Sequence, residues 1–314
     1  MPVILGRNSF VRIGEESTYG AGSSSANVFN RIVSTSLGRN QERSQTTHLS
    51  TSDAAFSQGF FDGMELAGGS LEIPIYYEGN GILLKAAIGS VVDGGGPPYS
   101  HTYRPTAVLP SLEITVQRGS GNAELFEGCV ISTMSLSVEA GGEMTASFEI
   151  IAETAQARSG SLTPSYGDGV QVLHYQAGTM SFNSVNYSLR SLDFNLDNKI
   201  DRRNLLGSKL TAQPLITDIR EVTMTVTCDL EDDNLYNAQL AGTQSDCEIT
   251  FTGTDADADT FKLKLFNAVI TSYSDEINTV GRIERTIEFQ GLADSSDPAF
   301  EIVIVNQDIS GIGN

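Results

Sequence analysis

Apolar and polar residues alternate with a period of two along much of the chain. The pattern is clearest over residues 112–118 and recurs over residues 144–150, 261–265 and 283–289. Because side chains on a strand point alternately to opposite faces, these segments are predicted strands with one buried and one solvated face. Such one-sided burial is typical of the antiparallel sheets found in sandwiches. The pattern therefore predicts a mainly β protein.

The predicted elements recur in the same order in the two halves of the chain. Each half has a strand, a short helix that ends at a glycine (Gly89 or Gly242), and three more strands. The successive segments are 71–75, 81–91, 112–116, 129–135 and 142–150 in the first half, and 222–226, 233–241, 247–251, 268–274 and 281–289 in the second. The last two segments of each half are separated by the same distance along the chain. Duplication of one β-sandwich unit explains this order, and chance alternation in an all-β protein is the alternative.

The similarity extends upstream, where residues 36–40 resemble residues 194–198. Each of these segments is followed by a polar stretch with little apolar periodicity, over 41–69 and 199–220. A segment rich in Ser, Gly and Pro over 156–170 has the composition of a linker. The predicted organisation is a first β-sandwich domain over 1–155, a linker over 156–176, a second domain over 177–292 and a C-terminal strand and tail over 293–314. The last apolar run, 300–305, is expected to pair with either domain or with a neighbour.

Charge and composition restrict the function classes. The 314 residues include 19 Lys and Arg against 39 Asp and Glu, a formal net charge of −20. Because binding to nucleic acid needs Lys and Arg against the phosphates, a DNA-binding role is disfavoured. Hydrophobic residues make up 39%, enough for real cores, and the 31 Gly with no Trp favour a protein of strands and turns.

The cysteines and the N-terminus indicate a protein made in a reducing compartment. Cys129, Cys228 and Cys247 form an odd set without CxxC spacing, which predicts buried free thiols and neither a disulfide framework nor a zinc site. The N-terminus lacks the basic region of a signal peptide, and no run approaches the ~18 apolar residues of a membrane helix. We therefore expect a protein that is made in a cytoplasm and has no membrane anchor.

The chain shows no catalytic constellation. His48, His101 and His174 lie far apart without Cys or Glu at ligand spacing, so each is expected on the surface or in a loop. The motifs GxSxG, GxGxxG and GxxxxGK[ST] are absent, which disfavours hydrolase and nucleotide-binding functions. We predict no enzyme activity, no cofactor and no metal.

One acidic loop resembles the start of a calcium site. Asp255, Asp257 and Asp259 are spaced like the first ligands of an EF-hand loop. Thr260 and Phe266 stand where such a loop needs Gly to turn the chain and Glu to complete the coordination sphere. A solvated acidic hairpin loop over 254–260 is the preferred interpretation, and calcium binding is the alternative.

Several phrases in order resemble one known family. They are GEESTYG at 14–20, HTY at 101–103, LPSLEITV at 109–116, EGCVI at 127–131, SLSV at 135–138 and GEMTASF at 142–148. Together they are similar to the tail tube proteins of phages with long, non-contractile tails, of the siphovirus type. The resemblance covers residues ~10–155, and the repeat extends it over 178–292.

The resemblance implies a structural protein of the virion tail that is assembled in the host cytoplasm. Family members fold as a β-sandwich flanked by a short helix, and their long hairpins join a β-barrel shared between subunits. Rings then stack into a tube through which DNA passes at ejection without sequence-specific binding. A chain with two copies of the unit implies a homotrimeric ring with pseudo-sixfold symmetry, and a hexamer with an added outer domain is the alternative. The implied partners are further copies of the chain and the tape measure, tail tip and terminator proteins.

The polar stretches 41–69 and 199–220 are the candidate hairpins of that barrel. Their charged residues are the candidate lumen and ring-interface residues: Glu42, Arg43, Asp53, Asp62, Glu65, Asp201, Arg202, Arg203, Asp218 and Arg220. We hypothesise that Arg202 and Arg203 form salt bridges with acidic neighbours around the ring. An acidic, hydrated lumen would repel DNA and let it slide.

Two other function classes share the β pattern. A carbohydrate-binding or adhesin-type β-sandwich module is disfavoured by the absence of Trp, the usual platform for sugars. A β-sandwich hydrolase is disfavoured because no acid pair or triad stands out. Two polar hairpin stretches of ~20–30 residues also have no use in a lone binding module.

Overall fold

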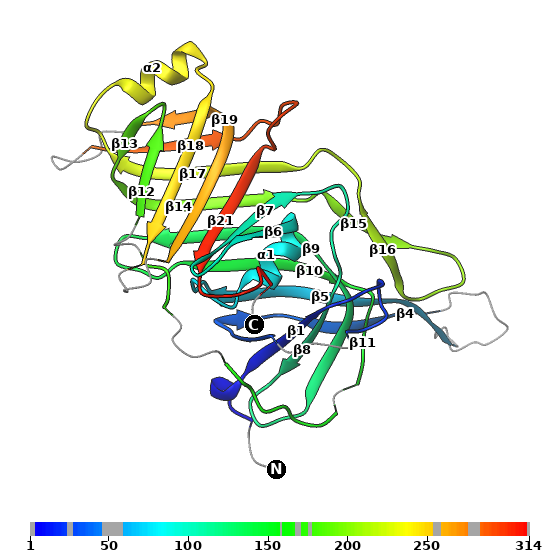
Figure 1. The fold of residues 1–314 in the computed structure, drawn as a ribbon. Helices are drawn as coiled ribbons and strands as arrows, with labels where there is room; N and C mark the ends of the chain where they lie inside the picture. Colours follow the sequence, from blue (N-terminus) through cyan, green and yellow to red (C-terminus); the bar gives the residue numbers. More distant parts are fainter. Residues whose placement is uncertain are drawn as a thin grey trace.

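The computed structural model describes residues 4–23, 28–45, 59–157, 159–166, 171–174, 178–253, 259–275 and 283–312. These residues form a mainly β structure with two short α-helices, as the alternation predicts (Figure 1). In the first half the elements are η1 (Gly6–Asn8), β1 (Phe10–Glu15), β2 (Val28–Arg31), β3 (Ser34–Thr35), β4 (Gly38–Gln45), β5 (Phe60–Pro74), α1 (Gly81–Ile88), β6 (Gly89–Gly95), β7 (Tyr99–Pro105), β8 (Leu112–Gln117), β9 (Ala123–Glu139), β10 (Thr145–Ala152) and β11 (Thr154–Ala155). In the second half they are β12 (Gly178–Phe182), β13 (Val185–Tyr187), β14 (Leu189–Asp197), β15 (Ile200–Asn204), β16 (Thr211–Ile216), β17 (Glu221–Asp229), α2 (Asn234–Ala241), β18 (Ser245–Thr252), β19 (Thr260–Ser274), β20 (Glu284–Gln290) and β21 (Phe300–Asn306).

The two halves share one strand-pairing scheme. In the first unit, residues 10–155, β1 pairs with β2 and β8, and the pairing continues through β9, β10 and β5 to β3 and β4. In the second unit, residues 178–290, β12 pairs with β13 and β18, and the pairing continues through β19, β20 and β17 to β14. A helix follows the corresponding strand in each unit, α1 after β5 and α2 after β17.

The units also share an irregularity in register. The β9–β10 ladder skips Ser132, and the β19–β20 ladder skips Thr271. Each of these hydroxyls donates to a main-chain carbonyl on the neighbouring strand, Ser132 to Glu149 at 3.1 Å and Thr271 to Glu288 at 3.2 Å. Because a bulge bends the strand that carries it, both long strands turn at the same point of their unit.

Strand pairing also fixes which upstream residues correspond, and it corrects the sequence comparison by one residue. Thr35 lies opposite Leu71, which lies opposite Phe148 on β10. In the second unit Leu192 lies opposite Val226, which lies opposite Ile287 on β20. Thr35 therefore corresponds to Leu192, and residues 36–40 correspond to 193–197 rather than to 194–198. The sequence misplaced the match because few apolar residues mark this stretch of the first unit.

One face of both units is a single open antiparallel sheet. The strand order in this sheet runs from β3 and β4 through β5, β10, β9, β14, β17 and β20 to β19 (Figure 1). The units join in this sheet where β9 pairs with β14, from Glu139 opposite Ser191 to Thr133 opposite Asp197. Buried residues such as Leu136 and Phe194 hold one face of the sheet against the core.

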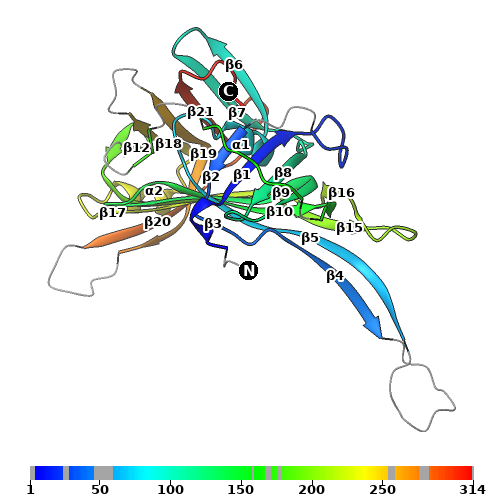
Figure 2. The ribbon, with the colours of Figure 1, turned by 90° about the horizontal axis from the view of Figure 1, so that it is seen from below.

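A second layer of strands covers the other side of that core (Figure 2). In the first unit it contains β2, β1, β8, β11 and the N-terminal part of β9. In the second unit it contains β13, β12, β18 and the N-terminal part of β19. The C-terminal strand β21 pairs with β19 on one side and with β7 on the other, so it links the two units.

The two helices occupy corresponding places but differ in burial. Both lie within the predicted segments; α1 ends at Ile88 before Gly89, and α2 ends at Ala241 before Gly242. Seven of the eight α1 residues are buried, whereas only Leu235 is buried in α2. The difference arises because β6 and β7 pack on α1, and α2 packs mainly on β19.

The three cysteines are buried free thiols, as predicted. The expectation for His101 is wrong, because this side chain lies on β7 with 1% exposure. Its Nδ1 lies 2.8 Å from the Asp93 carboxylate, and its Nε2 lies 3.0 Å from the Asn306 side-chain oxygen. His48 lies outside the described residues, and His174 forms a bridge with Glu143. Among the described residues, no helix is long and apolar enough to span a membrane.

Candidate assembly surfaces

The open sheet presents one continuous polar face. Along its strands the residues that alternate with the core positions are mostly Ser, Thr, Asn, Asp and Glu. Cross-strand pairs such as Ser147–Ser135, Ser135–Asn195 and Asn195–Thr223 carry the polar rows across both units. The carboxylates on this face include Glu72, Glu139, Glu149, Asp193, Asp197, Glu221, Asp229, Glu284 and Glu288.

Cations on this face are few and paired. Arg190 forms ion pairs with Asp229 at 3.0 Å and with Glu284. Lys199 lies 2.7 Å from Asp197 and 2.8 Å from Glu221, and these contacts lower the pKa of Asp197 against the opposing effect of desolvation. The face is therefore hydrated and predominantly acidic, which is unsuitable for holding phosphates.

The two ends of the sheet are open edges. β19 pairs with β20 on one side over Val269–Ser274, and no strand in the described part of the chain pairs with its other side there. At the opposite end, β3 and β4 pair only with β5 within the same described ranges. An unpaired edge offers main-chain donors and acceptors to another strand. Both edges are therefore candidate joints.

Two sets of contacts support the β9–β14 joint between the units, one within the open sheet and one that reaches α1. Ser137 donates to the Asp193 carboxylate across the β9–β14 pair at 2.7 Å. The fully buried Asn198 amide donates to the carbonyls of Ala87 at 2.9 Å and Ile131 at 3.0 Å, so it caps the end of α1.

Arg220 contributes to the same joint. Its guanidinium donates to the carbonyls of Thr106 at 3.0 Å and Ile88 at 3.1 Å. Burial, which disfavours the charged form, lowers the pKa of Arg220 to about 10. Arg220 was a candidate for the lumen or ring interface, and the structure places it between the two units of one chain.

Both predicted hairpin stretches contain hairpins. β4 and β5 extend from the end of the sheet, well away from the rest of the molecule (Figure 2). β15 and β16 form a separate two-stranded sheet that lies against β5. The candidates Glu42, Arg43 and Asp62 lie exposed on the β4–β5 hairpin, where Arg43 and Asp62 are 3.3 Å apart. Asp53 lies outside the described residues.

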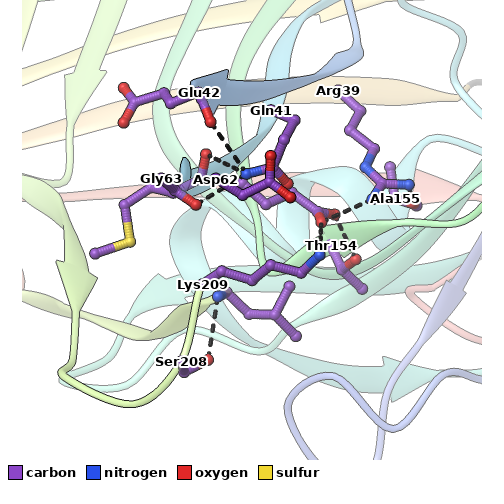
Figure 3. A network of polar contacts seen from close by, with 12 residues as sticks. Arg39, Gln41, Glu42, Asp62, Gly63, Thr154, Ala155, Ser208 and Lys209 are labelled. Carbon is purple, nitrogen blue, oxygen red and sulfur yellow. Dashed lines mark hydrogen bonds and ion pairs between the residues drawn. The ribbon is translucent and has the colours of Figure 1, made fainter. Parts of the chain in front are cut away.

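Glu65 joins the two hairpins, in the network that contains Arg39, Thr154 and Lys209 (Figure 3). Its side chain is 1% exposed, and it accepts hydrogen bonds from Arg39 at 2.8 Å and from the Thr154 hydroxyl at 2.8 Å. The Glu65 amide donates to the carbonyl of Lys209 on the β15–β16 hairpin at 2.9 Å, and the Lys209 ammonium lies 4.0 Å from the carboxylate. The stretch 41–69 pointed to Glu65, but no local signal identified its partner in the other stretch.

Arg202 has an intramolecular role. Its half-buried guanidinium donates to the Ala67 carbonyl on β5 and to the Thr211 hydroxyl, and burial lowers its pKa. These contacts within the chain hold the Arg202 guanidinium against β5, and the hypothesised salt bridge of Arg202 with an acidic neighbour around the ring stays a prediction. Arg203, Asp201 and Asp218 lie on or beside the β15–β16 hairpin, and the pairing of Arg203 with a neighbour stays a prediction.

No group of three or more His, Cys, Asp or Glu in the described ranges could hold a metal ion. Asp255 and Asp257 of the acidic loop lie outside those ranges. The strands that precede and follow them in the sequence, β18 and β19, are paired antiparallel neighbours.

Comparison with known proteins gives one family match. The sequence model of the family described as phage tail tube protein matches residues 6–291. The solved structure of Hcp1 from Flavobacterium johnsoniae shares 12% sequence identity with the chain, with a TM-score of 0.27. That similarity covers 37% of this chain and 89% of Hcp1. No curated protein is significantly similar to the chain.

Proposed function

The chain belongs to the phage tail tube protein family, and we propose that it forms stacked rings whose channel carries DNA at ejection. The observation that supports this most strongly is the continuous acidic face of an open sheet whose two ends are unpaired in the described residues. Repeating the sheet around an axis would close it and remove its edges. The motif phrases favour a long, non-contractile tail.

The polar face of the sheet would line the channel. Its hydroxyls and carboxylates hold water and repel phosphate, so DNA would pass without being retained. The opposite face of the sheet is already covered by the core, which leaves the polar face as the one that can meet an aqueous lumen. The channel would therefore be inert toward DNA sequence.

We propose that the two units arose by duplication and that three chains form one ring with pseudo-sixfold symmetry. The shared pairing scheme and the matched bulges at Ser132 and Thr271 support this. The β4–β5 and β15–β16 hairpins alternate around such a ring and project toward neighbouring copies. The tape measure, tail tip and terminator proteins are the expected partners at the ends of the tube.

Electron microscopy of the purified protein at low and high salt, together with its mass in solution, tests this function. We expect tubes or stacked rings with a central channel. High salt should favour assembly, because a net charge of −20 makes separate chains repel one another. A protein that remains monomeric at every salt and protein concentration, and that binds glycans instead, would contradict the proposal.

A further inference from the structure

We propose that β19 of one chain pairs with β3 and β4 of a second copy in the register that β9 and β14 use inside the chain. This inference rests on the proposed function and adds the segments and the residue pairs of the joint between chains. The β9–β14 pairing inside the chain is the template for this pairing between chains. In the shared pairing scheme β19 corresponds to β9, and β3 and β4 correspond to β14.

The first correspondence follows from the bulges. Ser132 and Thr271 are the residues that the two ladders skip, and each donates to the carbonyl of the matching glutamate on the next strand. The residue after each bulge is then equivalent, so Thr133 on β9 corresponds to Ser272 on β19. Both have side chains on the polar face of the sheet, because each is paired with a polar-face glutamate.

The second correspondence follows from the opposite end. Thr35 corresponds to Leu192 through the pairing with β5 and β17, so Asn40 corresponds to Asp197. Leu37 then corresponds to Phe194, and both of these side chains are buried. A shift of one residue would place Leu37 on the polar face, which the buried core does not allow.

The register of the joint between chains follows from the two correspondences, Thr133 with Ser272 and Asp197 with Asn40. Inside the chain Thr133 lies opposite Asp197, Met134 opposite Leu196 and Ser135 opposite Asn195. Between chains the matching pairs are Ser272 with Asn40, Tyr273 with Arg39, and Ser274 with Gly38. The strands run antiparallel, as β9 and β14 do.

The residues at the new joint suit those positions. Ser272, Ser274 and Asn40 are exposed in the single chain and would extend the polar rows of the sheet. Tyr273 is half-buried, and Arg39 already directs its guanidinium to Glu65 and the Ala155 carbonyl on the core side. The two edges lie at opposite ends of one sheet, so the partner is a second copy.

Cysteine cross-linking tests the register. In Ser272→Cys with Asn40→Cys, mild oxidation of the assembled protein should give disulfide-linked dimers and trimers on a non-reducing gel. Strands paired directly bring Cα atoms to about 4.5–5.5 Å, within the range a disulfide spans. The native cysteines are buried and should not compete.

Two variants serve as controls. Thr133→Cys with Asp197→Cys places the pair at the joint inside the chain. It should form a disulfide within each chain and give no linked dimers or trimers on the gel. Ser274→Cys with Asn40→Cys is displaced by two residues, and its diagonal separation of about 7–8 Å should lower the yield on the order of tenfold.

The outcomes separate the two proposals. Rings or tubes in the microscope that cross-link best through the displaced pair, or through neither pair, would overturn the register and leave the tube function standing. Chains that never associate in any variant would overturn the tube function and the joint together. Efficient interchain cross-linking of Ser272→Cys with Asn40→Cys alone supports both.

Discussion

Glu65 is the side chain on which the two hairpins converge. Glu65→Ala should lower the free energy of unfolding by about 1–3 kcal/mol, because Arg39 and Thr154 lose a buried acceptor. Arg39 keeps part of its solvation, which holds the loss below that of a fully buried pair. Urea unfolding measures the change.

The exposed pair Arg43–Asp62 on the same hairpin provides the matched control. Asp62→Ala should change the free energy of unfolding by about 0–1 kcal/mol, since solvent screens this pair. Equal losses in the two variants would show that burial of Glu65 does not set its contribution.

For Glu153 we expect substitution to raise the free energy of unfolding, whereas substitution of Glu65 lowers it. Partial burial, together with the nearby carboxylates of Glu16 and Glu127, raises the pKa of Glu153. A raised pKa in the fold means that the contribution of Glu153 to stability is greatest below its ordinary pKa and is lost as the pH rises through the folded value. Glu153→Gln should therefore be more stable than the natural chain at pH 7.

That advantage should disappear near pH 4, where the natural carboxyl is protonated in the fold as well. Thermal unfolding at both pH values measures it, with the exposed Glu42→Gln as control. A Glu153→Gln chain that is less stable at pH 7 would show that its carboxylate is favourably held.

Among the elements, the strands with alternating burial were predictable from sequence, and so were both helices. In β17, for example, Val222, Met224 and Val226 are buried and the intervening threonines are not. Side chains on a strand alternate between its two faces, so burial of one face produces a period-two pattern in the sequence itself. Such strands can therefore be predicted without knowledge of their partners.

Other features depend on contacts between distant segments and were not predictable. Leu37 is the only fully buried residue between Ser34 and Gln45, so the alignment of β3 and β4 was one residue off. The burial of His101 requires Asn306 on β21, and the contacts of Arg202 require the Ala67 carbonyl on β5. No local pattern contains those partners.

The joint between units makes a prediction at the level of elements. Asn198→Ala should lower the free energy of unfolding by about 1–3 kcal/mol, because it leaves the buried carbonyls of Ala87 and Ile131 without their donor. Asn195→Ala, exposed three residues earlier, should have little effect. Denaturant titration of both variants decides between this account and one in which Asn198 only fills space.

For the whole molecule, the acidic face predicts how an assembled tube treats DNA. Tubes of the natural chain should not retain DNA, because the carboxylates of the face repel phosphate. Thr223→Lys with Thr225→Lys places two cations on that face in every second unit. These tubes should retain DNA at low salt and release it as salt rises.

Filter retention of labelled DNA measures this difference, with Leu206→Lys on the exposed tip of the β15–β16 hairpin as control. If the two-lysine variant at Thr223 and Thr225 and the tip variant gain the same retention, DNA meets the outside of the tube, and the polar face is not its lining.

Electron cryomicroscopy of the assembled tube tests the central claim most directly. The account predicts rings of three chains with pseudo-sixfold symmetry, a continuous sheet around the channel, and Thr225 and Glu288 facing the lumen. Rings of six complete chains, or a sheet whose polar face points away from the channel, would contradict it.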